Sequence, residues 1–421
     1  MDTAIVLFNR DLRVHDHPAL AAACERAERV VPLFVLDPSV PEGRRRGFLL
    51  QCLADLRAAL KERGGDLVVR HGDVVGETMK LAGEAGATVI HASADVSSLA
   101  RRREERLAGE RIEYVRFPGV TVVPPDELRP SGGSDHYRVF TPYWNAWRRH
   151  RHRPVLPPPG QVRLPSGLPV GRLPRQEPVA GTLRGGESAG RERAERWLRD
   201  GLAGYADGHD DMAGDRTSRL SPYLRFGCVS PLELACRAEH GEEFVRQLCW
   251  RDFHHQVTYA FPRINRENYR RRERSWRHDR QALRAWQAGM TGLPIVDAGM
   301  RQLLAEGWMH NRARLIVAAY LVRRLGLDWR DGAGHFFEHL LDGDVANNSG
   351  NWQWVAGTGN DTRPNRGFNP LRQARRYDPA GDYVRRYVPE LADVPGAKVH
   401  EPWRLPAQPE GYPARLDGTD E

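Results

Sequence analysis

The strongest constraint on the fold is an alternation of short apolar runs with amphipathic stretches over the first third of the chain. The runs are rich in β-branched residues, as strands buried on both faces are: "AIVLF" (residues 4–8), "VVPLFVLD" (30–37), "LVVR" (67–70) and "TVIHAS" (88–93). A fifth strand is expected near 112–116. With helical periodicity around residues 18–28, 47–63, 74–85 and 97–109, the pattern predicts a doubly wound α/β domain with a parallel sheet. No G-x-G-x-x-G follows the first run, so this fold alone does not imply NAD.

A change in composition divides the chain. From residue 131 to 190 it is rich in Pro, Gly and Arg, as in "RHRPVLPPPGQVRLPSGLPVGRLP", which is typical of an extended connector. Beyond it, long helical periods replace the strand signals, as in "EEFVRQLCWRDFHHQVTYAF" and "GMRQLLAEGWMHNRARLIVAAYLVRRLGL". We therefore expect an α/β domain over residues 1–130, a connector over 131–190 and an all-α domain over 191–421.

Charge and cysteine usage narrow the classes of function. The chain has 63 Lys and Arg against 55 Asp and Glu, a net charge of +8, which favours a polyanionic partner. Its five cysteines are scattered and never spaced as C-x-x-C, which argues against a disulfide framework or a zinc site, and we expect no metal. The first apolar run is too short for a signal sequence and none is long enough to span a bilayer, so we expect a cytoplasmic protein.

Three segments of the helical half carry more polar groups than packing needs. "GDRTSRLSPYLRFG" (214–227) offers hydroxyls and free N–H groups for a phosphate, or a plain helix N-cap. "WMHNRARL" (308–315) sets arginines on an apolar helix, where they bind a ligand or reach to solvent. "DGDVANNSGNWQW" (342–354) combines acids, amides and two indoles, and is either a site or a turn that caps a helix. The residues alone leave these alternatives open.

Longer motifs resemble those of the photolyase/cryptochrome family, and most of all the bacterial class I cyclobutane pyrimidine dimer photolyases. They occur in that family's order and spacing: "FNRDLRVHDHPAL", "YRVFTPYWNAW", "TSRLSPYLRFG", "WRDFHHQV", "AWQAGMTGLPIVDAGMRQLLAEGWMHNRARL", "LDWRDG", "DGDVANNSGNWQW" and "VPELADVPGAKVHEPW". The resemblance implies that the helical domain binds FAD, and we expect a monomer. It also implies that light drives an electron from reduced FAD to a pyrimidine dimer flipped out of DNA, which then splits.

The resemblance assigns cofactor contacts residue by residue. Asn348 is implied to face N5 of the flavin, with Asp342 and Asp344 beside the ring and Arg314 paired with Asp342. The phosphate interpretation of the loop at 217–221 then outweighs the N-cap interpretation. The other implied contacts to FAD are Tyr205, Thr217, Ser218, Arg219, Leu220, Ser221, Gln247, Arg251, Asn311 and Gly343.

The tryptophans fall into two implied groups. Trp250 and Trp354 match apolar walls of the lesion pocket, which Asn311, Arg312 and Leu315 also help to form. Trp352, Trp329 and Trp276 match an electron-transfer chain that photoreduces oxidised flavin.

Two residues depart from the class I pattern. Gln247 stands where a glutamate is usual, as in many 6-4 photolyases and DASH-type cryptochromes, and Leu315 replaces a methionine. The segment "MHNRAR" lacks the histidine pair expected of 6-4 photolyases. We therefore predict repair of cyclobutane dimers; the alternatives are a cryptochrome-type blue-light photoreceptor, a 6-4 photolyase or a DNA-binding protein without flavin.

Two further predictions concern the rim of the lesion pocket and the N-terminal domain. Arg312 and Arg363 are expected to contact DNA phosphates, or only to balance nearby carboxylates. The N-terminal domain is expected to hold an antenna chromophore. Because "ADVSSLARRRE" stands where folate-binding members have an Asn-Glu pair, the resemblance favours 8-hydroxy-5-deazaflavin over methenyltetrahydrofolate or no antenna, with Arg45 and Asp95 as contacts.

Overall fold

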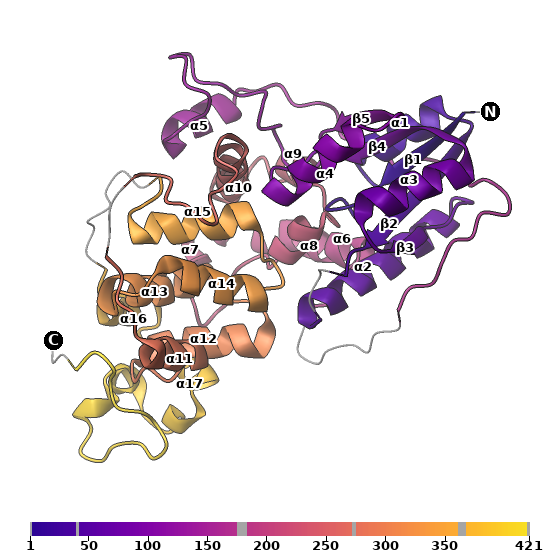
Figure 1. The fold of residues 1–421 in the computed structure, drawn as a ribbon. Coiled ribbons are helices and arrows are strands. Elements are labelled where there is room, and N and C mark those ends of the chain that lie inside the picture. Colours follow the sequence, from indigo (N-terminus) through magenta and orange to yellow (C-terminus); the bar gives the residue numbers. More distant parts are fainter. Residues whose placement is uncertain (1, 39–41, 175–182, 272–274, 361–367, 419–421) are drawn as a thin grey trace. The chain divides into compact units, whose positions relative to one another are not determined.

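A computed structural model describes residues 2–38, 42–174, 183–271, 275–360 and 368–418 (Figure 1). Arg363 therefore lies outside the described residues. The chain divides into two units: one comprises Met1–Leu202 and Ser218–Pro262, and the other comprises Ala203–Thr217 and Arg263–Glu421.

A parallel five-stranded sheet forms the core of the first unit, in the order β3-β2-β1-β4-β5. The central strand β1 is buried along its whole length, which explains why its sequence is apolar without alternation. Every strand lies within one residue of its predicted position: β1 (Thr3–Leu7), β2 (Arg29–Leu36), β3 (Val68–His71), β4 (Ala87–Ser93) and β5 (Glu113–Phe117).

Helices cover both faces of this sheet. Both α1 and α3 pack against β1, β2 and β4, which requires that they lie on opposite faces, and α4 packs beside α3. The doubly wound α/β prediction is confirmed. The four helices that connect the strands are α1 (Pro18–Arg26), α2 (Arg44–Lys61), α3 (Val74–Ala85) and α4 (Ser98–Ala108).

The predicted connector is not extended throughout. It contains α5 and the start of α6, and both belong to the first unit. Three helices beyond residue 190 also belong to the first unit. The division between the units therefore differs from the boundary that composition suggested. These helices are α5 (Phe140–Trp147), α6 (Glu187–Arg196), α8 (Ser221–Phe226), α9 (Pro231–Arg237) and α10 (Glu242–Ala260), with the π-helical turn η1 (Trp197–Gly201).

A buried carboxylate explains part of this difference. Asp252 of α10 accepts hydrogen bonds from the backbone N–H groups of Val122 and Val123 at 2.9 and 3.0 Å, and from Nε1 of Trp147 at 3.0 Å. Two segments far apart in the sequence are thereby joined to α10. Composition gives no sign of such a contact.

The second unit is built from helices, as expected, around one core of buried apolar side chains. Within the described ranges, no helix is long and apolar enough to cross a bilayer. The helices are α7 (Tyr205–Gly208), α11 (Arg280–Ala288), α12 (Pro294–Glu306), α13 (Asn311–Ala319), α14 (Trp329–His339), α15 (Val345–Ala356), α16 (Pro370–Tyr377) and α17 (Asp382–Tyr387), with the short helical turns η2 (Tyr320–Arg324), η3 (Pro389–Leu391), η4 (Gly396–His400) and η5 (Pro402–Arg404).

Asp252 should make the stability of the chain depend on pH. Burial raises the pKa of its carboxyl from 3.8 to about 6, despite the opposing effects of Arg251 and the three N–H donors. The folded protein therefore binds this proton more tightly than the unfolded chain does, and the resulting stabilisation is lost as pH rises from 3.8 through about 6. In wild type, the unfolding free energy should fall by up to about 3 kcal/mol over this pH range, because each tenfold change in proton affinity is worth about 1.4 kcal/mol. In Asp252→Asn this fall should be absent.

The measurement is denaturant unfolding of wild type and Asp252→Asn in a pH series that crosses this window. Asp200→Asn is the matched control, since Asp200 lies in an exposed ion pair with Arg199. A difference between wild type and Asp252→Asn that does not change with pH would contradict the assignment.

Candidate functional site

The helices α14 and α15 approach each other closely at Gly332. A Cβ atom on Gly332 would lie 2.2 Å from Cη2 of Trp352, so only glycine admits the indole there. Trp352 is 2% exposed, whereas Trp354 is half-buried. Residues two apart on a helix point in different directions, so the two indoles of "NWQW" have different surroundings.

A bidentate ion pair precedes α15. The guanidinium of Arg314 donates to the carboxylate of Asp342 at 2.8 and 3.2 Å, and the Asp342 side chain is 5% exposed. The predicted pairing is confirmed. Asp344 accepts from the backbone N–H of Asn347 at 3.1 Å and caps α15, so the capping interpretation of the turn also holds for this acid.

Asn348 is fixed by α14. Its Nδ2 donates to the backbone oxygen of Ala333 at 2.9 Å. This bond sets the orientation of the amide and leaves Oδ1 and the second N–H for another partner. A half-buried amide that offers both an acceptor and a donor suits a ring nitrogen whose protonation changes.

The three tryptophans of the predicted electron-transfer chain lie in or against one core. Trp329 and Trp352 are buried, and Trp276 packs at the edge of the same cluster. Trp329 begins α14, one turn before Gly332, and the indole of Trp352 packs against Gly332. Next to Trp276, the backbone of residue 277 pairs with residue 327, two positions before Trp329.

Hydrogen bonding distinguishes the two buried members of this chain. Nε1 of Trp329 donates to Oδ1 of Asn268 at 3.0 Å. Within the described part of the chain, Nε1 of Trp352 is buried and has no hydrogen-bond partner.

The loop at 217–221 precedes α8. Among the residues that the structure describes, no side-chain hydrogen bond caps this helix, which has Pro222 in its first turn. The hydroxyls of the loop bond within it, from Thr217 to Asp215 at 3.1 Å and from the Leu220 N–H to Ser218 at 3.3 Å. Arg219 has a positive φ of 50°, a backbone conformation that is uncommon outside glycine. The plain N-cap interpretation is therefore wrong, and an uncapped first turn favours an anion.

In the first unit, α10 carries Trp250, predicted for the lesion pocket, and the predicted FAD contacts Gln247 and Arg251. Trp250 stacks on Phe140 with ring centroids 3.6 Å apart and an interplanar angle of 3°. Gln247, one turn earlier, is exposed. Arg251 donates to the backbone oxygen of Val120 at 2.6 Å, and its side chain is only 11% exposed. Arg251 thus has a structural partner in addition to its predicted contact with a cofactor.

The structure argues against the DNA contact predicted for Arg312. Its guanidinium binds both carboxylate oxygens of Asp210, at 2.6 and 2.8 Å, and lies 4.2 Å from the ring centroid of Tyr377. This cation is neutralised locally, as the alternative interpretation had it. The remaining predicted residues of the second unit lie at the start of α7 (Tyr205), at the exposed start of α13 (Asn311), half-buried on α13 (Leu315) and in the turn before α15 (Gly343).

A cavity of about 240 Å³ lies at the carboxyl ends of β1, β2 and β4. The strand order reverses between β1 and β4, and such switch points are the usual ligand sites of doubly wound sheets. Arg45 and Asp95 both line the cavity, as the antenna prediction requires. Asp95 also pairs with Arg10 at 3.2 Å.

Sequence reasoning missed two partners of these groups. Phe140 stacks on Trp250 from 110 positions away, and Asp210 pairs with Arg312 from 102 positions away. The aromatic motif "YRVFTPYWNAW" was the one available signal for Phe140. No local pattern marks Asp210.

The sequence matches two models of known protein families. The family model described as "DNA photolyase" matches residues 4–161, and the one described as "FAD binding domain of DNA photolyase" matches residues 244–417. The chain is 50% identical to the deoxyribodipyrimidine photo-lyase of Streptomyces griseus, over 96% of this chain and 93% of that protein.

Two solved structures have a similar fold. One is a bacterial class III photolyase from Agrobacterium tumefaciens, with a TM-score of 0.92 and 32% identity over 99% of this chain and 94% of that one. The other is an archaeal photolyase from Sulfolobus tokodaii with two FAD molecules, with a TM-score of 0.87 and 31% identity over 99% of this chain and 96% of that one.

Proposed function

The chain belongs to the photolyase/cryptochrome family, and from this premise we propose that it is a deoxyribodipyrimidine photo-lyase that splits cyclobutane pyrimidine dimers in DNA. The observation that carries the proposal is the arrangement on α15, where Asn348 and Trp352 follow the Asp342–Arg314 pair. Within the family, the alternatives are a 6-4 photolyase and a cryptochrome-type blue-light photoreceptor without repair. We further propose that it acts as a cytoplasmic monomer.

The residues present fit FAD, the cofactor of this family's helical domain. When bound, reduced and excited by light, FAD would supply one electron to the dimer and recover it after the ring splits. Asn348 has an amide acceptor and donor to offer to N5, because its bond to Ala333 leaves both available. Arg314 compensates the charge of Asp342, so an acid can lie beside the ring without an uncompensated buried charge.

The uncapped first turn of α8 would hold the pyrophosphate. Its N–H groups and positive dipole end are suited to an anion, and no side chain of the described residues caps the helix by a hydrogen bond. Thr217, Ser218, Arg219, Leu220 and Ser221 would surround the phosphates. Tyr205, Gln247, Arg251, Asn311, Gly343 and Asp344 complete the proposed contacts to FAD.

Trp250 and Trp354 are proposed as the apolar walls against which the flipped dimer packs. Phe140 covers one face of Trp250 and so holds the indole in a fixed plane. Asn311 and Leu315 are proposed to contact the same lesion. Binding at the rim would depend on cations other than Arg312, whose charge Asp210 already balances.

We propose that the cavity beside Arg45 and Asp95 holds the antenna, 8-hydroxy-5-deazaflavin. A tricyclic chromophore suits a site that combines apolar walls such as Phe34 and Leu49 with a few charges. Methenyltetrahydrofolate and an empty cavity are the alternatives. The archaeal structure with two FAD molecules makes a second FAD a further candidate.

The role of Trp352 predicts a selective defect. Trp352→Phe should slow photoreduction of oxidised FAD at least about tenfold, since phenylalanine is harder to oxidise and about 1.4 kcal/mol of added barrier is enough. Repair by chemically pre-reduced enzyme should fall much less. Transient absorption and single-lesion repair measure the two activities. Trp308→Phe, at another buried indole of this unit, is the control, and equal loss of both activities in Trp352→Phe would contradict the role.

The lesion assignment is tested with oligonucleotides that carry one cyclobutane dimer or one 6-4 product. Under light, the reduced wild type should restore the first and leave the second. Gln247→Glu should preserve or raise the dimer yield only where the new acid is protonated, because a neutral carboxyl donates a stronger hydrogen bond to the reduced dimer than an amide does. Since position 247 is exposed in the free chain, the bound lesion must supply the burial that raises the pKa of this acid.

The yield of Gln247→Glu should therefore fall as pH rises, whereas that of wild type should not. A variant that loses yield as pH falls would contradict the pocket assignment. Repair of 6-4 products alone by wild type would overturn the lesion class, and no repair of either lesion would favour the photoreceptor.

The antenna proposal predicts selective reconstitution. Purified chain incubated with 8-hydroxy-5-deazaflavin should retain one equivalent after gel filtration. Arg45→Ala should weaken binding of the chromophore at least about tenfold, because a hydrogen bond to a charged group contributes about 1.5–3 kcal/mol. Methenyltetrahydrofolate should be lost on the column. Arg63→Ala, at an arginine outside the cavity, is the control, and retention of a second FAD instead would replace the deazaflavin.

A further inference from the structure

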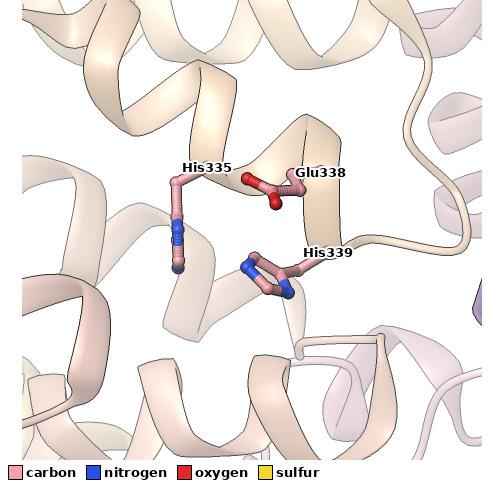
Figure 2. Close-up of side chains that lie close together, drawn as sticks. All are labelled: His335, Glu338 and His339. Atoms are coloured by element: carbon pink, nitrogen blue, oxygen red, sulfur yellow. The ribbon is translucent and has the colours of Figure 1, made fainter. Parts of the chain in front are cut away.

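Three potential metal ligands lie together on α14, outside the proposed flavin and lesion residues. His335, Glu338 and His339 occupy positions i, i+3 and i+4, which share one face of a helix. Their ligand atoms all lie within 4.8 Å of one another. Figure 2 shows the two imidazoles and the carboxylate turned toward a common space.

His335 has an unsatisfied ring nitrogen. Its Nε2 is buried and has no hydrogen-bond partner among the residues that the structure describes. A buried polar atom without a partner costs free energy, so such an atom calls for a ligand. A metal ion would satisfy it.

The surrounding rings hold His335 in place. Its ring contacts Trp286 edge-on, with centroids 5.7 Å apart, and Trp286 is itself fixed because its Nε1 donates to the backbone oxygen of Val317 at 3.0 Å. The ring of His339 lies 4.5 Å away at 54° to that of His335. The two imidazoles are tilted and not stacked flat, so their nitrogens can point at one ion.

We propose that His335, Glu338 and His339 bind one divalent transition-metal ion, with water completing its coordination. Two imidazoles four residues apart on a helix are a recurrent zinc-binding arrangement, and the carboxylate supplies a third ligand. Imidazole nitrogen selects Zn²⁺, Cu²⁺ or Ni²⁺ over Mg²⁺ and Ca²⁺, which prefer oxygen ligands. The expectation of no metal rested on cysteine spacing and did not consider this histidine pair.

The bound ion would be structural. It would join the last two turns of α14, which lead directly into the turn that carries Asp342 and Asp344. An ion that binds the folded chain and not the unfolded one raises stability in proportion to its occupancy.

The test is equilibrium dialysis of the full chain, prepared without a histidine tag, against Zn²⁺ alone. We expect one equivalent to bind, and we expect His339→Gln and Glu338→Gln each to weaken binding at least about tenfold, because even changes outside the first ligand shell do so. His339 is half-buried and Glu338 is exposed, so their replacement does not disturb the core. His240→Gln is the matched control, since His240 is 92% exposed and lies 3.6 Å from a carboxylate oxygen of Glu239.

Thermal unfolding gives a second readout. Zn²⁺ should raise the unfolding temperature of wild type and His240→Gln but not of His339→Gln, and Mg²⁺ should raise none of them. Absence of a stoichiometric ion in wild type, or equal affinity in wild type and His339→Gln, would overturn the proposal. Neither result bears on DNA repair.

Discussion

The contact of Trp352 with Gly332 is the constraint on which the candidate site depends. Because the indole occupies the space where a Cβ would be, α14 and α15 lie close enough for the Ala333 carbonyl to accept from Asn348. The chain must then reverse within a few residues between the helices, and that turn carries the carboxylate that Arg314 pairs with. A side chain at position 332 would separate the helices and move the amide, the indole and the acid together.

Local sequence predicts elements well here and their grouping poorly. The strands of the sheet were readable because a strand buried on both faces is apolar throughout, and β1 is such a strand. Local sequence does not indicate the unit to which α10 belongs. Asp252 joins this helix to Val122, Val123 and Trp147, which are more than a hundred positions away in the sequence. A Pro-rich composition likewise did not prevent α5 from forming within the predicted connector.

The same distinction applies to the candidate site. The Arg314–Asp342 pair was predicted because a long motif resembles a family in which that pair occurs, and not because the two residues have any sequence relationship of their own. A motif can also leave a role open: Arg312 lies in "WMHNRARL", and its charge could serve a DNA phosphate or balance a nearby carboxylate. The structure places Asp210 beside it, which favours the second role. An excess of eight positive charges therefore favours a polyanionic partner. The arginines that bind this partner are those without a carboxylate partner within the chain.

Helix α14 also shows how one element can couple two kinds of chemistry. At Gly332 it lies against Trp352, and at His335 it contacts Trp286, whose ring centroid is 6.1 Å from that of Trp352. A single aromatic ring thus separates the histidine cluster from the indole proposed to lose an electron. Positive charge near an indole disfavours removal of that electron, and a low dielectric strengthens the effect. Under the two proposals, the charge on the last turns of α14 therefore belongs to the electrostatic environment of Trp352, and the cluster and the electron-transfer chain are not independent.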